Sequence, residues 1–146
     1  MNTSNEHRRR IRRATPVIAL AAVAFIVGAI FGSGHHSSPQ QSLAEQFATA
    51  WARKDYATMY GDIDEASQRR ISPSAFAAAY QAATLTATET SIEVVGRARG
   101  ESDGAISVPM RVSTRLWGAL TESLRLRVSN SSAGPRVMWS HALVFP

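Results

Sequence analysis

Hydrophobic residues along this chain follow two different periods. Between residues 42 and 86 they recur every three or four positions, which predicts helices that bury one face. After Thr88 they alternate with polar residues, which predicts strands of a sheet with one buried face. Helices followed by strands are typical of an α+β domain, and we expect three helices packed on an antiparallel sheet of about four strands.

Capping residues indicate where each helix begins. The run Ser42-Leu43-Ala44-Glu45 has the pattern of a capping box, which would open the first helix. Asp55 is expected to cap a second, short helix, and Ser72-Pro73 combines a capping residue with a proline at the first helical position. The polar connector 62–70 is expected to be exposed. The apolar stripes of the first and third helices consist of Leu43, Phe47, Ala50, Trp51, Phe76, Ala79, Tyr80 and Ala83.

The strand half poses a problem of register. A two-residue turn that begins at Gly118 would place core-facing Val112 opposite surface-facing Arg125. Residues that pair across antiparallel strands lie on the same face, so this turn is disfavoured. A three-residue turn or a bulge near Gly118 restores the pattern and places Val112 opposite Leu124 or Leu126.

The outward positions of these strands are rich in arginine. We interpret this basic stripe as a solvated sheet face with acidic neighbours, and a surface for an anionic wall polymer or lipid headgroups is the alternative. The stripe consists of Arg111, Arg115, Arg125 and Arg127.

The last ten residues, VMWSHALVFP, predict a buried strand from Val137 to Val144. His141 lies within this expected strand beside Trp139, where packing or solvation explains it better than catalysis. Because globular domains rarely end flush with a core strand, we expect Phe145-Pro146 to be the seam between this domain and a following one.

An apolar run without any charged residue extends from Ala14 to Gly34. As a helix it would measure about 31 Å, close to the thickness of the hydrocarbon core of a bilayer. Because five arginines precede the run, we expect a single-pass transmembrane helix, with residues 1–13 as a basic cytoplasmic tail and the domain outside. These arginines are Arg8, Arg9, Arg10, Arg12 and Arg13.

The N-terminal region leaves one alternative open. A cleaved signal peptide would also begin with basic and apolar residues, although this run exceeds the usual apolar core of ~7–15 residues. We expect an uncleaved anchor, then a polar tether over residues 35–41 and an extracytoplasmic domain over residues 42–146. His35 and His36 are interpreted as part of the tether rather than as metal ligands.

The positive charge of the chain is concentrated in its tail. The sequence holds 16 basic residues, 15 of them arginine, and 11 acidic ones. Without the five tail arginines and Glu6, 11 basic and 10 acidic residues remain. The folded part therefore lacks the excess charge of a nucleic-acid-binding domain, and its arginine and alanine content suggests a bacterial source. The absence of cysteine excludes a disulfide framework and a thiol nucleophile.

Several residues, taken in order, resemble the nuclear-transport-factor-2-like (NTF2-like), MecA-type N-terminal domain of class B penicillin-binding proteins. The resemblance covers residues 42–146 and depends on order and spacing, since no single motif is specific alone. The residues that carry it are Trp51, Asp55, Tyr56, Ser72, Pro73, Phe76, Gly118, Trp139, Phe145 and Pro146.

The resemblance implies a cone in which three helices wrap a curved sheet, and a role without chemistry. Such a module lifts a transpeptidase domain off the membrane and packs against it during peptidoglycan synthesis, which links it to penicillin binding and the antibiotic response. The implied partners are the membrane, a transpeptidase domain in the same or another chain, and other cell-wall synthesis proteins. The alternative is a free-standing, membrane-anchored assembly or binding subunit of the same fold, associated with secretion or transport.

No pattern in the sequence predicts catalysis, a cofactor or a metal site. A penicillin-binding transpeptidase needs a serine three residues before a lysine, and a later Lys-Thr-Gly. The only lysine, Lys54, is preceded at that spacing by Trp51 and is followed by Asp55-Tyr56. The carboxylates Asp62 and Asp64 are a weak metal signal, and we interpret them as capping or solvated residues. We therefore expect a non-enzymatic chain.

Overall fold

The computed structural model describes residues 37–144. The basic tail with its five arginines, the expected transmembrane helix 14–34 and the expected seam Phe145-Pro146 lie outside these described residues. The membrane anchor therefore stays a prediction. Among the helices of the described part, none combines the length and the apolar character that a membrane span requires.

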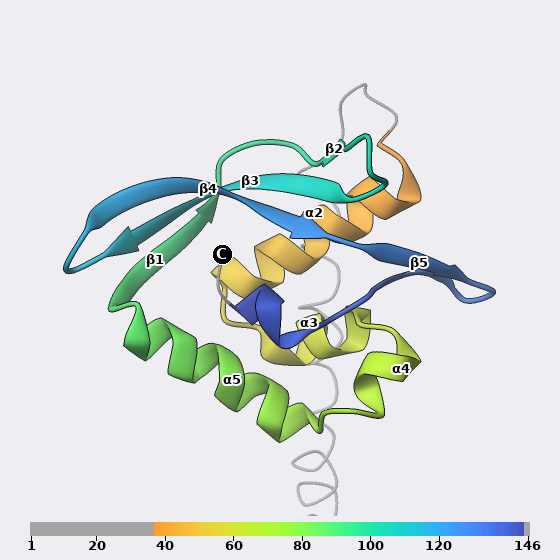
Figure 1. The fold of residues 1–146 in the computed structure, drawn as a ribbon, viewed down its shortest axis with the longest axis horizontal. Helices are drawn as coiled ribbons and strands as arrows, with labels where there is room; N and C mark the ends of the chain where they lie inside the picture. Colours follow the sequence, from red (N-terminus) through yellow and green to blue (C-terminus); the bar gives the residue numbers. More distant parts are fainter. Residues whose placement is uncertain (1–36, 145–146) are drawn as a thin grey trace, which may run out of the picture. The chain divides into compact units, whose positions relative to one another are not determined.

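Helices fill the first half of the described region, and strands fill most of the second (Figure 1). The helices lie on one face of the main sheet (Figure 1), with α2 beneath the central strand. This order confirms the predicted mixed architecture, although the described part has four α-helices rather than three. The helices are α2 (Pro39–Ala52), α3 (Tyr56–Asp62), α4 (Glu65–Gln68) and α5 (Pro73–Thr86).

Helix α2 begins one turn before the predicted start. Its cap is Ser38, whose hydroxyl accepts a hydrogen bond from the Gln41 backbone while the Gln41 side chain accepts one from the Ser38 backbone. This is a complete capping box, and Pro39 occupies the first turn, where its missing N–H is no loss. The predicted box at Ser42 is wrong, because the Ser42 N–H already bonds the Ser38 carbonyl within the helix.

The predicted starts of α3 and α5 are confirmed. Asp55 caps α3 by accepting hydrogen bonds from the Thr58 backbone and hydroxyl. Ser72 caps α5 by accepting from the Ala75 backbone, with Pro73 at the first position. Both starts follow from local chemistry alone, which explains why the sequence reveals them.

The connector between α3 and α5 differs from the exposed loop that we predicted. It forms the short helix α4, capped by the Asp64 side chain, which accepts from the Ser67 backbone. Asp62, Ile63 and Ser67 are buried. The connector is polar in composition, yet it packs against the end of the chain, where Ile63 pairs with Val137.

The main sheet is antiparallel and four-stranded within the described residues, as predicted. Strand β3 lies at its centre, with β1 and β2 on one side and β4 on the other. The outer edge of β4 has no neighbouring strand in the described part of the chain. Two further strands form a separate hairpin. The bounds are β1 (Glu89–Val94), β2 (Arg99–Gly100), β3 (Ile106–Thr114), β4 (Gly118–Leu126), β5 (Val128–Ser131) and β6 (Gly134–Val137).

The turn between β3 and β4 has three residues, 115–117, as the register argument predicts. Gly118 follows with a φ of 72°, a left-handed conformation that glycine adopts without strain. The hydroxyl of Thr114 fixes the turn, because it accepts from the Trp117 N–H and donates to the Gly118 carbonyl.

The predicted partners of Val112 are wrong, although Val112 does pair with a leucine of β4. Val112 lies opposite Leu120, while Leu124 and Leu126 pair with Val108 and Ile106. The difference arises because β3 ends at Thr114, three residues before the end that the alternating pattern indicated. Leu116 and Trp117 consequently belong to the turn.

The end of the chain also differs from the prediction. The last strand, β6, ends at Val137, and residues 141–144 form the 3-10 helix η2 (His141–Val144). His141 therefore lies in a helical turn at the surface and not in a strand. The expected strand from Val137 to Val144 does not form, because the backbone of Trp139 bonds a helix rather than a sheet.

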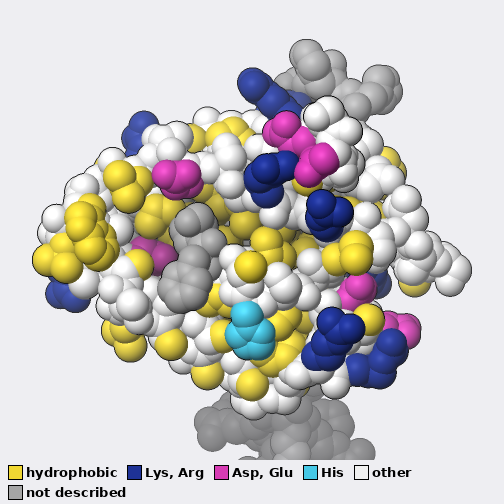
Figure 2. Space-filling model, in the orientation of Figure 1, with side chains coloured by type: hydrophobic (Ala, Val, Ile, Leu, Met, Phe, Trp, Pro, Cys, Tyr) yellow, Lys and Arg dark blue, Asp and Glu magenta, His cyan; other side chains and the backbone are white. Residues whose placement is uncertain are grey.

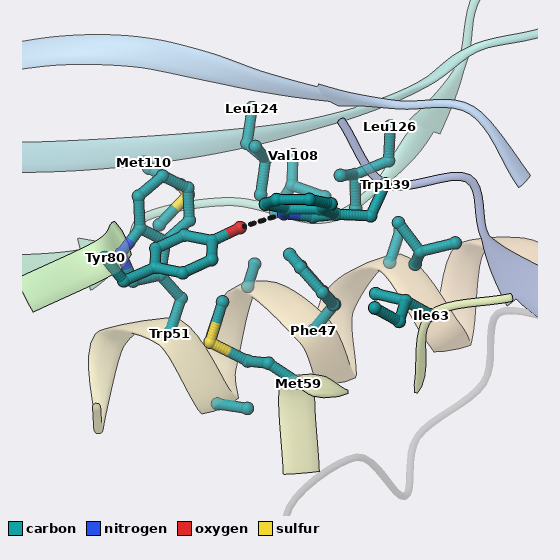
Figure 3. Close-up of a cluster of buried hydrophobic side chains, with 14 of the residues drawn as sticks. Phe47, Trp51, Met59, Ile63, Tyr80, Val108, Met110, Leu124, Leu126 and Trp139 are labelled. Carbon is teal, nitrogen blue, oxygen red and sulfur yellow. Dashed lines mark hydrogen bonds between the residues drawn. The ribbon is translucent and has the colours of Figure 1, made fainter. Parts of the chain in front are cut away.

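The core lies between the inner face of the sheet and the helices (Figure 3). The outer half of β4 extends beyond this layer, so that residues 118–123 are all exposed. Glu122 is among them, although it lies opposite buried Met110 and so occupies an inward-facing position. The largest fully buried side chains are Tyr80, Phe47, Phe76, Met59, Ile63, Met110, Leu126, Val108 and Val137.

The start of α2 can be tested by removing each candidate cap. We expect Ser38→Ala to lower the free energy of unfolding of residues 37–146 by about 1 kcal/mol, because it removes an N-cap. Ser42→Ala should change it by less than about 0.5 kcal/mol, because Ser42 is exposed within the helix. Urea unfolding followed by circular dichroism measures both. The reverse order of the two effects would show that the helix begins at Ser42.

Candidate functional site

Four aromatic residues singled out from separate parts of the sequence converge on Tyr80. Its ring centroid lies 5.1 Å from that of Trp51, 5.9 Å from Tyr56 and 5.0 Å from Phe76. The ring of Trp139 lies 5.3 Å from that of Phe76. We call these five residues the aromatic cluster. Such edge-on and tilted pairs each contribute about 0.5–1.5 kcal/mol beyond burial, so the cluster joins α2, α3, α5 and the end of the chain.

A buried hydrogen bond connects the two polar members of the cluster (Figure 3). The indole N–H of Trp139 donates to the Tyr80 hydroxyl over 3.1 Å, and that hydroxyl donates to the Leu143 carbonyl over 3.5 Å. Burial raises the pKa of Tyr80 well above its usual range, and the bond from Trp139 only partly offsets this. Tyr80 therefore stays neutral, which suits a structural link and not a proton-transfer group.

A single serine of α4 holds the backbone of Trp139. The Ser67 hydroxyl accepts from the Trp139 N–H over 3.1 Å and donates to the Trp139 carbonyl over 3.2 Å. One buried side chain thus replaces both bonds that a neighbouring strand would supply. The chain leaves the sheet after Val137 for this reason, and turns toward the helices.

A small cavity lies beside the aromatic cluster. Its volume of about 20 Å³ admits roughly one water molecule. Pockets that bind metabolites are at least about ten times larger. The residues around it are Trp51, Tyr80, Ala83, Thr84, Ala87, Glu89, Val112 and Val144.

The titratable groups near this cavity have shifted pKa values without forming a catalytic site. Burial raises the pKa of Glu89, and the charge of Lys54 and the Thr84 hydroxyl partly offset the effect. Burial likewise raises the pKa of Tyr56. A carboxyl group of raised pKa beside a tyrosine suits general acid–base chemistry. The cavity, however, leaves no space for a substrate between them.

The adjacent residues Asp55 and Tyr56 have separate roles. Asp55 caps α3, and the hydrogen bonds from Thr58 lower its pKa, whereas Tyr56 stacks on Tyr80. They form no catalytic pair. Within residues 37–144, no group of three histidine, cysteine or acidic side chains is placed to hold a metal ion.

Asp62 is a buried carboxylate that the sequence did not reveal. Its exposed fraction is 7%, and the Gln46 amide donates to both of its oxygens, over 2.9 and 3.1 Å. Burial raises the pKa of Asp62 to about 6. The bond from Gln46 and the charge of Arg136 counteract this rise, and the charge of Asp55 adds to it. Burial thus favours the neutral form of Asp62, whereas the hydrogen bond from Gln46 that joins α3 to α2 favours the charged form.

The outward arginines have acidic neighbours. Arg125 bonds Asp103 over 2.9 Å, and Arg127 lies 4.0 Å from the same carboxylate. Arg111 lies opposite Glu93 of β1. The structure thus favours the solvated-face interpretation for these arginines. The fourth member of the predicted stripe, Arg115, is in the turn and not on the face.

Sequence reasoning missed how the nominated residues are connected. Tyr80 was placed on an apolar stripe, but nothing local indicated that it accepts a bond from a tryptophan 59 residues away. Ser67 and Gln46 gave no signal, because their partners are 72 and 16 residues distant. The positions that sequence reasoning did find are those with a local cause: Asp55, Ser72 and Pro73 as helix starts, and Gly118 with its positive φ.

Comparison with known families matches residues 38–146 to the NTF2-like N-terminal transpeptidase domain. The chain belongs to this family. The match confirms the resemblance read from the sequence, and it begins at Ser38, the residue that caps α2. It identifies the domain as the N-terminal module of a transpeptidase-type protein and not its catalytic unit. A search of curated proteins finds no match to the chain.

The buried carboxylate predicts an unusual pH dependence. Since the folded-state pKa of Asp62 is about 6, above that of an unfolded aspartate, the folded state binds the proton more tightly. Stability should fall as pH rises from about 4 to 6, by up to about 3 kcal/mol. Asp62→Asn should remove this fall and stabilise the domain at pH 7.5, as measured by urea unfolding across pH. Asp64→Asn, which keeps a cap of equal quality, should retain the wild-type fall. An unchanged profile in Asp62→Asn would contradict the assignment.

The link between Tyr80 and Trp139 can be tested by removing one hydroxyl. Tyr80→Phe should lower the free energy of unfolding by about 1–3 kcal/mol, because the buried indole N–H loses its acceptor. It should also speed hydrogen exchange in residues 138–144, which the same hydroxyl joins to α5. Tyr56→Phe keeps its ring in the cluster and should cost less than about 0.5 kcal/mol. Equal losses in the two variants would show that only ring packing matters.

Proposed function

We propose that this chain is the non-catalytic, membrane-anchored N-terminal module of a penicillin-binding protein. It serves there as spacer and docking surface for a transpeptidase domain, in the same chain or in another, during peptidoglycan synthesis. The observation that carries the proposal is the family match over residues 38–146, which covers nearly all of the described domain.

The internal connections of the domain support a mechanical role. The start of α2 is tied to the β5–β6 hairpin, because Gln40 donates to Asn130 over 3.2 Å. The last described residues are held by Ser67 and Tyr80. The segment that follows the expected anchor and the segment that leads out of the domain thus share one core. The start of α2 and the last described residues are therefore fixed relative to each other.

The chemistry of the described residues supports a role without catalysis. The carboxyl groups whose pKa is raised by burial are Glu89, beside a cavity of water size, and Asp62, which accepts from a glutamine amide. The cavity beside Glu89 has no room for a substrate. The module would affect penicillin binding and the antibiotic response through the transpeptidase domain that it positions.

The proposal can be tested in membranes of the source organism with an epitope tag at the native N-terminus. We expect the tagged protein to remain in the membrane after carbonate extraction. It should either bind fluorescent penicillin as a band above 15.8 kDa, or form cross-links with a penicillin-labelled protein. Prior treatment with unlabelled penicillin should abolish the label, and deletion of residues 1–34 should release the protein from the membrane.

Two results would contradict the proposal in different ways. A tagged band near 15.8 kDa that forms no cross-link to any penicillin-labelled protein would favour the free-standing assembly subunit. Release of the intact tagged chain by carbonate would refute the anchor and favour a peripheral attachment.

A further inference from the structure

The turn between β3 and β4 carries exposed apolar side chains at one end of the domain. Leu116 and Trp117 are 69% and 62% exposed. We call residues 115–117 the hairpin tip. Figure 2 shows hydrophobic side chains gathered over this tip, at the left of the view. Leu120 of β4 and Leu85 of α5 are also exposed, and Leu85 is near because the Arg115 N–H bonds Thr88, three residues beyond it.

Two backbone N–H groups of the hairpin tip, those of Arg115 and Trp117, are hydrogen-bonded within the domain. The N–H of Trp117 and the carbonyl of Gly118 both bond the Thr114 hydroxyl, over 3.0 and 3.2 Å. The N–H of Arg115 bonds the Thr88 carbonyl over 3.0 Å. A segment that leaves water for a less polar medium must bond its backbone groups internally, since each unpaired group is costly there. The hairpin tip meets part of this requirement through the N–H groups of Arg115 and Trp117.

The charges of the hairpin segment itself are positive, and Glu89 of β1 lies opposite Thr114 beside the hairpin tip. Residues 111–121, RVSTRLWGALT, include two arginines and no acidic residue. Tryptophan and arginine are side chains with an apolar body and a polar end, which suits the boundary between lipid headgroups and acyl chains. The hairpin tip therefore combines apolar residues for the boundary with a cation for anionic headgroups.

The expected anchor keeps the domain close to a bilayer. Four residues separate Gly34, the end of the apolar run, from Pro39, the start of α2, and four residues reach at most about 14 Å. The bond between Gln40 and Asn130 places the start of α2 beside the β5–β6 hairpin. In Figure 1 this region and the hairpin tip lie at opposite ends of the domain.

We propose that the hairpin tip inserts Leu116 and Trp117 into the headgroup region of an anionic bilayer, as a second membrane contact. The inference rests on the proposed anchor. With one end tethered and the other inserted, the domain lies along the membrane instead of standing on its tether. A lipid surface fits better than a protein partner, because protein interfaces centre on residues buried in pockets, and the hairpin tip is a narrow protrusion.

The three tryptophans of the chain allow a direct test. Trp51 and Trp139 are 3% and 7% exposed, so Trp117 is the one that water reaches, and residues 1–36 contain none. The full chain would be reconstituted into vesicles of phosphatidylcholine and phosphatidylglycerol, with and without brominated acyl chains. We expect the brominated lipid to quench the tryptophan fluorescence, and acrylamide, which acts from the water, to quench it only weakly. The quenching by bromolipid and the weak quenching by acrylamide should both disappear in Trp117→Phe, because the other two tryptophans are buried.

Variants separate insertion from unspecific contact. Leu116→Ser should reduce the quenching of Trp117 by bromolipid at least about twofold, because it removes apolar area from the inserted turn. Met138→Ser removes an exposed apolar residue outside the hairpin tip and should leave the quenching unchanged. Equal effects in both variants would overturn the proposal.

A second experiment tests the insertion of the hairpin tip without the expected anchor. Residues 37–146 form a compact unit of their own, and a hexahistidine tag before Ser37 would attach them to vesicles that contain nickel-chelating lipid. We expect the same quenching of Trp117 by bromolipid. If the full chain fails to float with vesicles while this domain shows the quenching, the anchor is wrong and the insertion stands. If acrylamide reaches Trp117 freely and bromolipid does not in either format, the insertion is refuted, and a protein partner would account for the exposed residues.

Discussion

The hydrogen bond from the Trp139 indole to the Tyr80 hydroxyl determines how the second half of the molecule closes on the first. A buried N–H requires an acceptor, and Tyr80 provides one from the middle of α5. The segment after Val137 consequently turns away from the sheet and crosses the helices. Ser67 completes the arrangement by bonding both backbone groups of Trp139.

The parts of the fold that the sequence predicts are those with local causes. Asp55, Ser72 and Pro73 start helices because their side chains act within one turn of the chain. The three-residue turn follows from the period of the strands, since only a turn with an odd number of residues places Val112 opposite a leucine of β4. The start of α2 was predicted at Ser42, whereas the structure caps the helix at Ser38 with Pro39 in the first turn.

The parts that the sequence does not predict depend on distant partners. The end of β3 is fixed by the Thr114 hydroxyl, and alternation alone cannot show where a strand stops. Asp62 stands in a stretch of polar residues that resembles a loop, and only Gln46 of another helix makes its burial possible. The nominated aromatic residues were correct as core positions, but their common contact with Tyr80 needs the packing of α2, α3 and α5.

The open edge of β4 affects whether neighbouring copies of this domain can join their sheets. The outer edge of β4 is open within the described chain, and open edges are templates on which other strands pair. Glu122 occupies an inward position on that edge, opposite Met110. A strand that paired with this edge, together with a layer that covered it, would have to remove the Glu122 carboxylate from water. Crowded side by side, copies of the domain would meet a built-in barrier to joining their sheets, so local concentration alone would not turn them into an aggregate.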